Sequence, residues 1–372
     1  MLIGVVKEIK NHEYRVGIVP ASVYELVHLG HQVVVETNAG LGIGFSDDDY
    51  LAMGAEIAQT AEVVFSIAEL IVKVKEPLAE ERARLREGQI LFTYLHLAPD
   101  RDQTEDLINS KAICIAYETV TSNSGGLPLL APMSEVAGRM SVQAGAQCLE
   151  KSNGGCGLLL AGVPGVSPAK VVIIGGGVVG SNAAKIALGM GAKVAILDRS
   201  LEVLRRLDNQ FGGSLETLYA SKDALEQQVL AADLVIGAVL VPGAAAPKLV
   251  TADMIKRMRP GSAVVDVAID QGGCFATSHA TTHADPTYIV DDVVHYCVAN
   301  MPGAVPRTST VALNNATLPY IVSIANKGYK AALLEDPHLL NGLNVYKGKV
   351  TCRSVAESLG LEYVDASEAL AI

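Results

Sequence analysis

The segment VVIIGGGVVG at residues 171–180 decides the fold class of this chain. Four β-branched residues come before three glycines, Gly175, Gly177 and Gly180, which have the spacing G-x-G-x-x-G. The pattern predicts a buried strand, a tight turn and the first turn of a helix. In that arrangement the first glycine makes the turn, the second lets the backbone approach a pyrophosphate, and the third lets the helix pack closely on the strand. A glycine-rich turn that binds nothing is the alternative.

A second apolar run, AKVAILD at 192–198, predicts the next strand and places Asp198 at its end. A carboxylate there accepts hydrogen bonds from both ribose hydroxyls of adenosine and repels a 2′-phosphate, so it favours NAD over NADP. Arg199 follows directly and is able to pair with a 2′-phosphate, which leaves NADP as the alternative.

Further strands complete this series, with a helix from about 180 to 191 and apolar runs at 232–240 and 262–270. Buried runs of this kind are typical of a doubly wound sheet, whose ligands bind at the carboxyl ends of the strands. The segment VAIDQGG brings Asp270 to that edge. An ordinary turn or cap carboxylate is an equally good interpretation of Asp270 on position alone.

The first 130 or so residues alternate apolar runs with amphipathic stretches, such as the helical pattern at 21–30. Repeated strand and helix units predict a second parallel sheet. After Pro306 comes a long helical pattern that contains Pro319 and then a helical tail. Because the tail has too few strands to stand alone, we place it on the first sheet. The strands expected in that sheet lie at 2–6, 32–36, 70–74, 90–95 and 112–118.

The fold class that follows is α/β, with two doubly wound, Rossmann-like domains. The NAD-binding domain, 131–306, is inserted into the substrate-binding (catalytic) domain, which consists of 1–130 and 307–372. A helix at 134–151, with Ser134 as its N-cap, is expected to make the crossing between them.

Composition excludes several classes of function. The net charge of the 372 residues is −11 without a block of like charges, which argues against a nucleic-acid partner. The N-terminal apolar run is too short for a signal peptide, so we expect a soluble, cytoplasmic protein with no membrane association. Six scattered cysteines without a C-x-x-C pair predict buried, reduced thiols and no metal site.

Two polar residues that follow apolar runs are candidates for chemistry. Lys75 follows LIVKV and His96 follows ILFTYL, so both would lie at strand ends. Oxidation of an amine needs a base near neutral pH, a cation that holds a carboxylate, and a hydride acceptor. His96, Lys75 and NAD would supply these three. Taken singly, a solvated strand-end lysine and a partly buried, hydrogen-bonded imidazole are the simpler interpretations.

Long blocks of the chain resemble the alanine dehydrogenase family, which is related to the NAD-binding subunit of transhydrogenase. The N-terminal stretch GVVKEIKNHEYRVGIVPASVYEL carries this resemblance, as do VKVKEP, TYLHLA, APMSEVAGR, GVPGV, VDVAIDQGG and VANMPGAVPRTST. Together they cover nearly the full chain in the family's order. The resemblance implies NAD-dependent oxidative deamination of L-alanine to pyruvate and ammonium, and a homo-hexamer.

The resemblance also implies residue roles. Arg15 and Lys75 would bind the substrate, His96 would be the acid/base, and Asp270 the second catalytic group. An ion pair of Arg15 with Glu13 or Glu8 is the alternative for the arginine. Besides the three glycines, the cofactor contacts would fall on Ser134, Val178, Val179, Asp198, Val239, Leu240, Val267, Ala268, Ile269, Asp270, Val298, Ala299, Asn300 and Met301.

Two positions depart from the family pattern. Ala220 lies where a serine often contacts the adenosine, and His279 occupies a place often held by arginine. These departures concern peripheral cofactor contacts. Two other functions remain open from the sequence: the transhydrogenase subunit, which has no need for a water-activating base, and a non-catalytic NAD-binding sensor.

Overall fold

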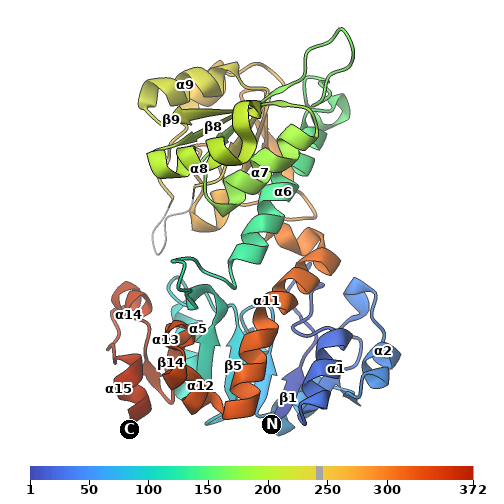
Figure 1. Ribbon diagram of the computed structural model, residues 1–372, viewed down its shortest axis with the longest axis vertical. Coiled ribbons are helices and arrows are strands. Elements are labelled where there is room, and N and C mark those ends of the chain that lie inside the picture. The colour runs from blue at the N-terminus through green and yellow to red at the C-terminus, as the bar shows by residue number, and fades with distance from the viewer. Residues whose placement is uncertain (240–245, 372) are drawn as a thin grey trace. The chain divides into compact units, whose positions relative to one another are not determined.

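The computed structural model describes residues 1–239 and 246–371, and the chain folds into two units (Figure 1). Unit 1 consists of Met1–Met133 and Val305–Ile372, and unit 2 of Ser134–Ala304. Each unit contains its own sheet with helices packed against it, and the chain leaves unit 1 and returns to it. The expected α/β class and the insertion of one Rossmann-like unit into the other are therefore confirmed.

The sheet of unit 1 has eight strands in the order β15-β14-β6-β5-β4-β1-β2-β3. Strands β1 to β6 pair in parallel, and β1 lies between β2 and β4, so the chain changes direction across the sheet between β1 and β4. Such a switch point opens a crevice at the carboxyl ends of the strands. The strands are β1 (Leu2–Val5), β2 (Gln32–Glu36), β3 (Glu56–Ala58), β4 (Leu70–Val72), β5 (Ile90–Thr93), β6 (Ile113–Ala116), β14 (Leu343–Tyr346) and β15 (Lys349–Val350).

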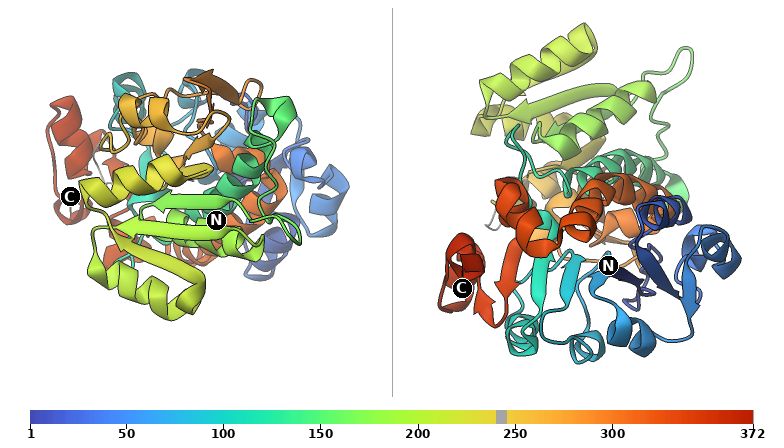
Figure 2. Two further views of the ribbon diagram at one scale, coloured as in Figure 1. Left: turned by 90° about the horizontal axis from the view of Figure 1, so that it is seen from above. Right: turned by 60° about the horizontal axis from the view of Figure 1, so that its bottom comes forward.

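The C-terminal tail joins unit 1, as expected, but the prediction that it is wholly helical is wrong. Strand β14 pairs antiparallel with β6 and adds an edge to the sheet, where Figure 2 shows the red C-terminal segment in its right view. The run LNVY contains a polar residue, Asn344, whose burial is possible because its amide donates to the Thr119 hydroxyl and the Gly342 carbonyl. The four residues are all buried.

The helices of unit 1 cover both faces of its sheet. Helix α11 begins with Pro306 at its first turn and continues through Pro319, as the sequence predicted. The α-helices are α1 (Pro20–His28), α2 (Asp47–Ala52), α3 (Ala61–Ile67), α4 (Ala79–Arg82), α5 (Arg101–Ser110), α11 (Pro306–Lys327), α12 (Tyr329–Glu335), α13 (Pro337–Leu340), α14 (Arg353–Leu359) and α15 (Ala366–Ala371). The 3-10 helices of this unit are η1 (Leu41–Ile43) and η2 (Tyr117–Thr119).

Unit 2 has a seven-stranded sheet in the order β12-β13-β11-β10-β7-β8-β9, parallel except for β12. Its switch point lies between β7 and β10, because β7 pairs with β8 on one side and with β10 on the other. The strands are β7 (Lys170–Ile174), β8 (Lys193–Asp198), β9 (Leu215–Tyr219), β10 (Leu234–Gly237), β11 (Ala263–Asp266), β12 (Thr287–Val290) and β13 (Val293–Tyr296).

Helices α7 and α8 pack on one face of this sheet and α9 and α10 on the other, as Figure 1 shows for the first three. The α-helices are α6 (Ala131–Cys148), α7 (Val178–Gly189), α8 (Leu201–Phe211), α9 (Lys222–Ala231) and α10 (Ala252–Arg257). The 3-10 helices are η3 (Lys151–Asn153), η4 (Gly212–Ser214), η5 (Val267–Gln271) and η6 (Met301–Ala304).

Two predictions of element boundaries are corrected. Helix α6 begins at Ala131, so Ser134 lies inside the helix and is not its N-cap. A proline is well tolerated in a first helical turn, which lets the helix include Pro132. The run 262–270 is not one strand, because β11 ends at Asp266 and the following residues form η5.

Cysteine burial and helix hydropathy complete the description of the fold. All six cysteines are free, and Cys114, Cys148, Cys274 and Cys297 are buried, whereas Cys156 is exposed. Over residues 1–239 and 246–371, no helix is both long and apolar enough to cross a membrane.

Candidate active site

The three predicted reacting residues of unit 1 follow three neighbouring strands. Arg15 comes after β1, Lys75 after β4 and His96 after β5, and β4 pairs with both other strands. Parallel strands end at the same edge of a sheet, so all three residues lie at the carboxyl edge, around the switch point. The sequence predicted this placement for Lys75 and His96, and the structure adds Arg15 to it.

Arg15 is almost completely buried, and its guanidinium forms an ion pair with Glu13. The Nε and Nη2 atoms of Arg15 donate to the two carboxylate oxygens of Glu13 at 2.7 and 2.6 Å, and Nη1 points to the Met133 sulfur at 3.1 Å. Burial alone would lower the pKa of Arg15, but the hydrogen bonds and charge of Glu13 raise it overall. The alternative ion pair with Glu13 is therefore present, in a buried form that fixes the arginine rigidly.

Lys73 and Lys75 have opposite surroundings although only one residue separates them. The Lys73 ammonium is fully buried between Glu8 and Glu81, at 3.1 and 2.6 Å from their oxygens. Burial would lower the pKa of Lys73, but these two carboxylates raise it. Lys75 is half-buried, and its amine makes no ion pair or hydrogen bond with the residues that the structure describes. Burial would raise the pKa of the neighbouring Glu76, but the charges of Lys75 and Lys10 lower it overall. Of the two lysines, Lys75 is the one that is not enclosed by carboxylates.

Glu8 joins the ends of β1 and β4 across the switch point. Its Oε1 accepts the backbone N–H groups of Val74 and Lys75 at 2.7 and 3.3 Å, and its Oε2 accepts from Lys73 at 3.1 Å. Burial raises the pKa of Glu8, while the charge of Lys73 acts in the opposite direction. We refer to Glu8, Lys73 and Glu81 as the charge cluster.

His96 has a backbone conformation that side chains rarely adopt, with φ of 50°. Glu118, on η2, holds this turn by accepting the N–H of His96 at 2.6 Å and that of Leu95 at 3.2 Å. A Glu118 oxygen also lies 4.0 Å from Nδ1 of the imidazole, and the ring stacks beside Tyr94. The His96 side chain is 48% exposed. The turn thus presents an accessible imidazole, and Glu118 holds the backbone that carries it.

The glycine motif of unit 2 has the geometry that its sequence predicts. Gly175, with φ of 102°, follows β7, and a Cβ there would lie 2.7 Å from the carbonyl oxygen of Ala238. A Cβ on Gly180 would meet the carbonyl oxygen of Gly175 at 1.8 Å, so α7 packs directly on the turn. A Cβ on Gly177, the N-cap of α7, would meet no atom of the described residues within 4 Å. That open approach to a helix N-terminus suits a pyrophosphate.

Asp198 ends β8 beside this turn. One of its carboxylate oxygens accepts the N–H of Gly176 at 2.7 Å, and the other accepts the N–H of Ser200 at the same distance. These bonds fix the carboxylate and leave lone pairs on both oxygens for ribose hydroxyls. Arg199 is exposed.

The remaining predicted cofactor residues gather at the same edge of unit 2, apart from Ser134 on α6. Val178 and Val179 form the first turn of α7, and Val239 follows β10. Leu240 lies outside the described residues. Residues 267–270 form most of η5 after β11, and residues 298–301 follow β13, with Asn300 at a φ of 65°.

The two positions that depart from the family pattern have local partners. The N–H of Ala220 donates to the Asp198 carbonyl, and the hydroxyl of Ser221 caps α9. Both residues therefore lie in regular, hydrogen-bonded structure. His279 is exposed and stacks on Tyr288, with ring centroids 3.7 Å apart. At the position where the family often has arginine, this chain therefore has an exposed imidazole that stacks on an aromatic ring.

Asp266 occupies the strand end that the sequence predicted for Asp270. It is fully buried and accepts the N–H groups of Ala268 and Cys274 at 3.2 and 2.9 Å and the hydroxyl of Ser278 at 2.6 Å. Burial raises the pKa of Asp266, against the effect of these donors. Asp270 is exposed on η5, the turn that Asp266 holds at its N-terminus.

Sequence reasoning gave no role to Glu81, Glu118 and Asp266, and it named Glu8 only as a possible ion-pair partner of Arg15. Glu8, Glu81 and Asp266 are buried and Glu118 is partly buried, and each accepts backbone or ammonium N–H groups. The available signal was an acidic residue within a few positions of a buried apolar run, as in LIGVVKE and AVVD.

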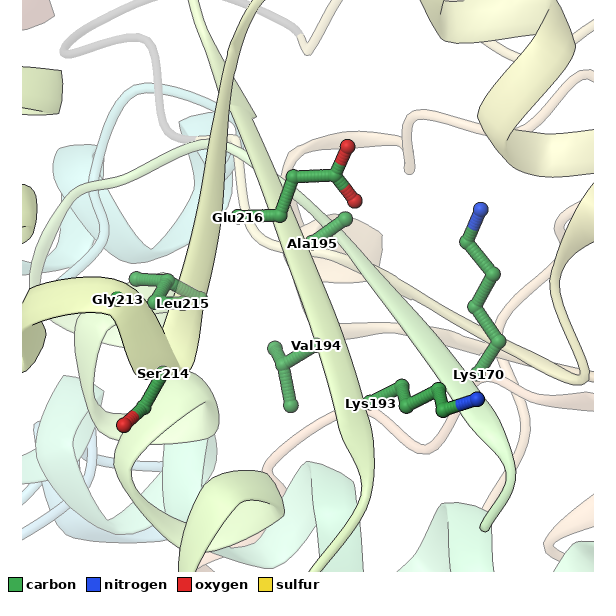
Figure 3. Close-up of a pocket in the computed structure, with 8 residues that line it drawn as sticks. All are labelled: Lys170, Lys193, Val194, Ala195, Gly213, Ser214, Leu215 and Glu216. Carbon is green, nitrogen blue, oxygen red and sulfur yellow. The ribbon is translucent and has the colours of Figure 1, made fainter. Parts of the chain in front are cut away.

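A hollow in unit 2 lies at the other edge of the sheet. Lys170 and Lys193, the first residues of β7 and β8, line it together with Ser214 and Glu216 (Figure 3). The amino ends of parallel strands are not where doubly wound sheets bind nucleotides. We therefore consider the carboxyl edge of each sheet as a candidate site, each by itself.

Comparison with known proteins gives the same family over the whole chain. Residues 4–137 match the family model "Alanine dehydrogenase/PNT, N-terminal domain", and residues 141–353 match "Alanine dehydrogenase/PNT, C-terminal domain". An alanine dehydrogenase of Halomonas elongata is 62% identical over 99% of both chains. One of Methanococcus maripaludis is 58% identical over 100% of both chains.

Solved structures show the same pattern. A structure of an L-alanine dehydrogenase superposes with a TM-score of 0.94 at 54% identity, over 97% of this chain and 99% of that one. A transhydrogenase structure from Sinorhizobium meliloti has a TM-score of 0.83 at 23% identity, over 94% of this chain and 100% of that one. The second likeness shows a shared fold alone.

Proposed function

The chain belongs to the alanine dehydrogenase/PNT family, and from this premise we propose that it is an NAD-dependent L-alanine dehydrogenase. The reaction converts L-alanine, water and NAD into pyruvate, ammonium, NADH and a proton, and it is reversible. The observation that supports this most directly is the set of two cations and an imidazole around the switch point of unit 1. These groups match the needs of a carboxylate-bearing amine substrate.

NAD is the cofactor that the residues of unit 2 fit. The open approach at Gly177 and the N-terminus of α7 would hold the pyrophosphate, and Asp198 would hold the adenosine ribose. When bound, NAD supplies the acceptor for the hydride that leaves the alanine Cα. Asp198 is already oriented by Gly176 and Ser200, so its negative charge opposes a 2′-phosphate at no cost in reorganisation.

Arg15 and Lys75 are proposed to bind the substrate. A carboxylate suits the planar guanidinium of Arg15, which Glu13 holds in one orientation. Lys75 brings an ammonium that makes no ion pair within 4 Å with a described residue, and it would stabilise negative charge on the oxygen that becomes the pyruvate carbonyl. Both contacts draw the substrate to the carboxyl edge of unit 1.

His96 is proposed as the acid/base. Its imidazole would take a proton from the water that attacks the imine carbon and later return it to the departing nitrogen. Glu118 stabilises the ring position through the two backbone N–H groups and lies near Nδ1. Asp270, exposed on η5 of unit 2, is proposed as the second catalytic group.

The assay that tests this function follows NADH absorbance with NAD and a panel of L-amino acids, and in reverse with pyruvate, ammonium and NADH. We expect turnover confined largely to L-alanine and pyruvate. NAD binding without turnover in either direction would overturn the proposal and favour a transhydrogenase subunit or a sensor. Hydride exchange between NADH and an NADP analogue, in the presence of a membrane partner, would then distinguish those two.

Replacing His96 with Ala tests the acid/base role. General acid–base catalysis contributes about 10²–10⁴-fold to a rate, so we expect kcat to fall by that factor while NAD binding is unchanged. His28→Ala is a matched control, because His28 ends α1 and its Nδ1 contacts the Tyr24 carbonyl of the same helix. Normal turnover of the His96 variant would contradict the assignment.

We also propose that the chain assembles as a homo-hexamer, which rests on the family resemblance. Light scattering of the purified protein should then give a mass of six times 38.9 kDa. A mass of one or two chains at working concentration would contradict it.

A further inference from the structure

The two lysines that follow β4 pose a question about how Lys75 is held. Its amine makes no hydrogen bond or ion pair with the described residues, although its charge acts on Glu76. Its side chain carries four rotatable bonds, so the side chain alone does not fix where the charge lies. Its backbone, in contrast, is anchored. The Lys75 N–H donates to Glu8, and the Lys75 carbonyl accepts from the hydroxyl of Thr93 at 2.9 Å.

Glu8 is the anchor that reaches across the switch point. It lies 67 positions before Lys75 in the sequence, three residues beyond the end of β1. One carboxylate oxygen serves the N–H groups of Val74 and Lys75, and the other serves the Lys73 ammonium. Glu81 accepts from the same ammonium and also receives the N–H of Leu78, which holds the loop from the far side of Lys75.

We propose that Glu8 is a positioning residue that sets the place of Lys75 for the substrate, with Lys73 and Glu81 holding Glu8 in turn. The inference deepens the proposed function and rests on it, because Lys75 is the substrate cation there. It explains why three buried charges lie directly behind the substrate edge. Buried charges are weak contributors to stability by themselves, whereas a network of fixed geometry can specify a position.

An isosteric substitution exposes this role. Both oxygens of Glu8 face donors, and glutamine has only one acceptor, with an NH2 group in place of the other oxygen. In Glu8→Gln the NH2 group therefore faces either the backbone N–H of Val74 or the Lys73 ammonium. The remaining Lys73–Glu81 pair is neutral, so the variant keeps a balanced interior charge.

The experiment compares Glu8→Gln and Glu8→Ala with Glu69→Gln. Glu69 directly precedes β4, is exposed, and accepts the N–H of Leu2 at 3.3 Å, at the opposite end of the strand from Lys75. We expect both Glu8 variants to lower kcat/KM for pyruvate by about 10-fold or more, the usual effect of losing a hydrogen bond to a charged group. The KM for NADH should stay near that of the parent in both Glu8 variants, and Glu69→Gln should match the parent throughout.

Amide hydrogen exchange gives a readout that does not depend on activity. In the Glu8→Ala variant the N–H groups of Val74 and Lys75 should exchange about 10-fold faster or more than in the parent, while those within β5 do not change. Unchanged exchange would overturn the inference whatever the activity. Faster exchange with parental kcat/KM would overturn the positioning role alone. A parent without alanine turnover would refute the proposed function, and exchange would then decide by itself whether Glu8 holds this segment.

Discussion

At the switch point of unit 1, Glu8 and Lys73 are buried and paired across the gap between β1 and β4, whereas at the switch point of unit 2 peptide groups meet directly. There the Gly175 turn lies against the Ala238 carbonyl at a distance that leaves no room for a side chain. The parallel strands of the two sheets follow the same order, β3-β2-β1-β4-β5-β6 in unit 1 and β9-β8-β7-β10-β11-β13 in unit 2, and in each sheet the candidate binding residues follow the carboxyl ends of the strands. They differ in the groups at the switch point, which are charged side chains in unit 1 and backbone peptide groups in unit 2.

The difference follows from the ligands proposed for each edge. A small carboxylate needs fixed cations, and fixed cations need buried counter-charges to hold the backbone that carries them. A pyrophosphate instead needs backbone N–H groups at close range, which only residues without a side chain permit. Unit 1 should therefore be sensitive to changes of charge and pH, and unit 2 to the addition of single carbon atoms.

The largest effect is expected for Lys73→Met. The substitution leaves Glu8 and Glu81 buried without their cation, and breaking a buried ion pair in this way costs about 3–5 kcal/mol of unfolding free energy. The loss should shrink in acid. Burial raises the pKa of Glu8 above its ordinary value of 4.5. A carboxyl group whose pKa is raised in the folded state favours folding when it is protonated, which is the case below pH 4.5. This contribution to stability is lost as the pH rises through the folded-state pKa.

Chemical denaturation of this variant at several pH values checks both statements. Lys170→Met, at the start of β7, is the control from unit 2, since Lys170 forms no ion pair with the described residues and should change stability by less than about 0.5 kcal/mol. Equal losses in the two variants would remove the contrast between the units.

A smaller effect is expected for Gly180→Ala, which tests unit 2. Its new Cβ would lie 1.8 Å from the Gly175 carbonyl oxygen, and such overpacking costs about 1–3 kcal/mol. Gly177→Ala is the matched substitution, because no atom of the described residues crowds that position and stability should be unchanged or gain up to about 1 kcal/mol. Its NAD affinity, measured by calorimetry, should nonetheless fall about 10-fold or more. Unchanged NAD affinity in Gly177→Ala would place the pyrophosphate elsewhere.

The smallest effect is expected for Asp198→Ala, which removes a fixed charge from the edge of unit 2. Affinity for NAD should fall somewhat, because the turn loses the acceptor for the Gly176 N–H. The ratio of kcat/KM for NAD to that for NADP should fall about 10-fold, since the repulsion of a 2′-phosphate is gone. Asp223→Ala, an exposed acid on α9, is the control. An unchanged ratio would refute the role of Asp198.

Sequence patterns predicted most of the framework. Strand β2 has the expected bounds of 32–36, and β7, β8 and α11 lie within one or two residues of the prediction. These segments combine long apolar runs with clear punctuation by glycine, aspartate or proline, so local chemistry and tertiary packing favour the same structure. The βαβ repetition predicted that both sheets are mainly parallel, but the antiparallel pairings of β12, β14 and β15 were not predicted.

The charge cluster could not be predicted in the same way. Lys73 interrupts an apolar run, which reads as an alternating, half-exposed strand, and its burial depends on Glu8, 65 positions away. The run that ends in Asp270 was misread for the opposite reason. Its apolar letters continue past Asp266, but Asp266 caps the next turn with its own side chain and so ends β11 four residues early.

The insertion of unit 2 has a consequence for the order in which the chain folds during synthesis. Strand β6 pairs with β14 across more than 200 positions. One edge of β6 therefore stays unpaired until the ribosome has made all of Ser134–Ala304 and the tail as far as β14. Unit 2 is continuous and is able to fold as soon as it emerges. We therefore expect the later-emerging unit to be complete first, and a nascent chain halted before Leu343 to expose the apolar edge of β6 to chaperones and to aggregation.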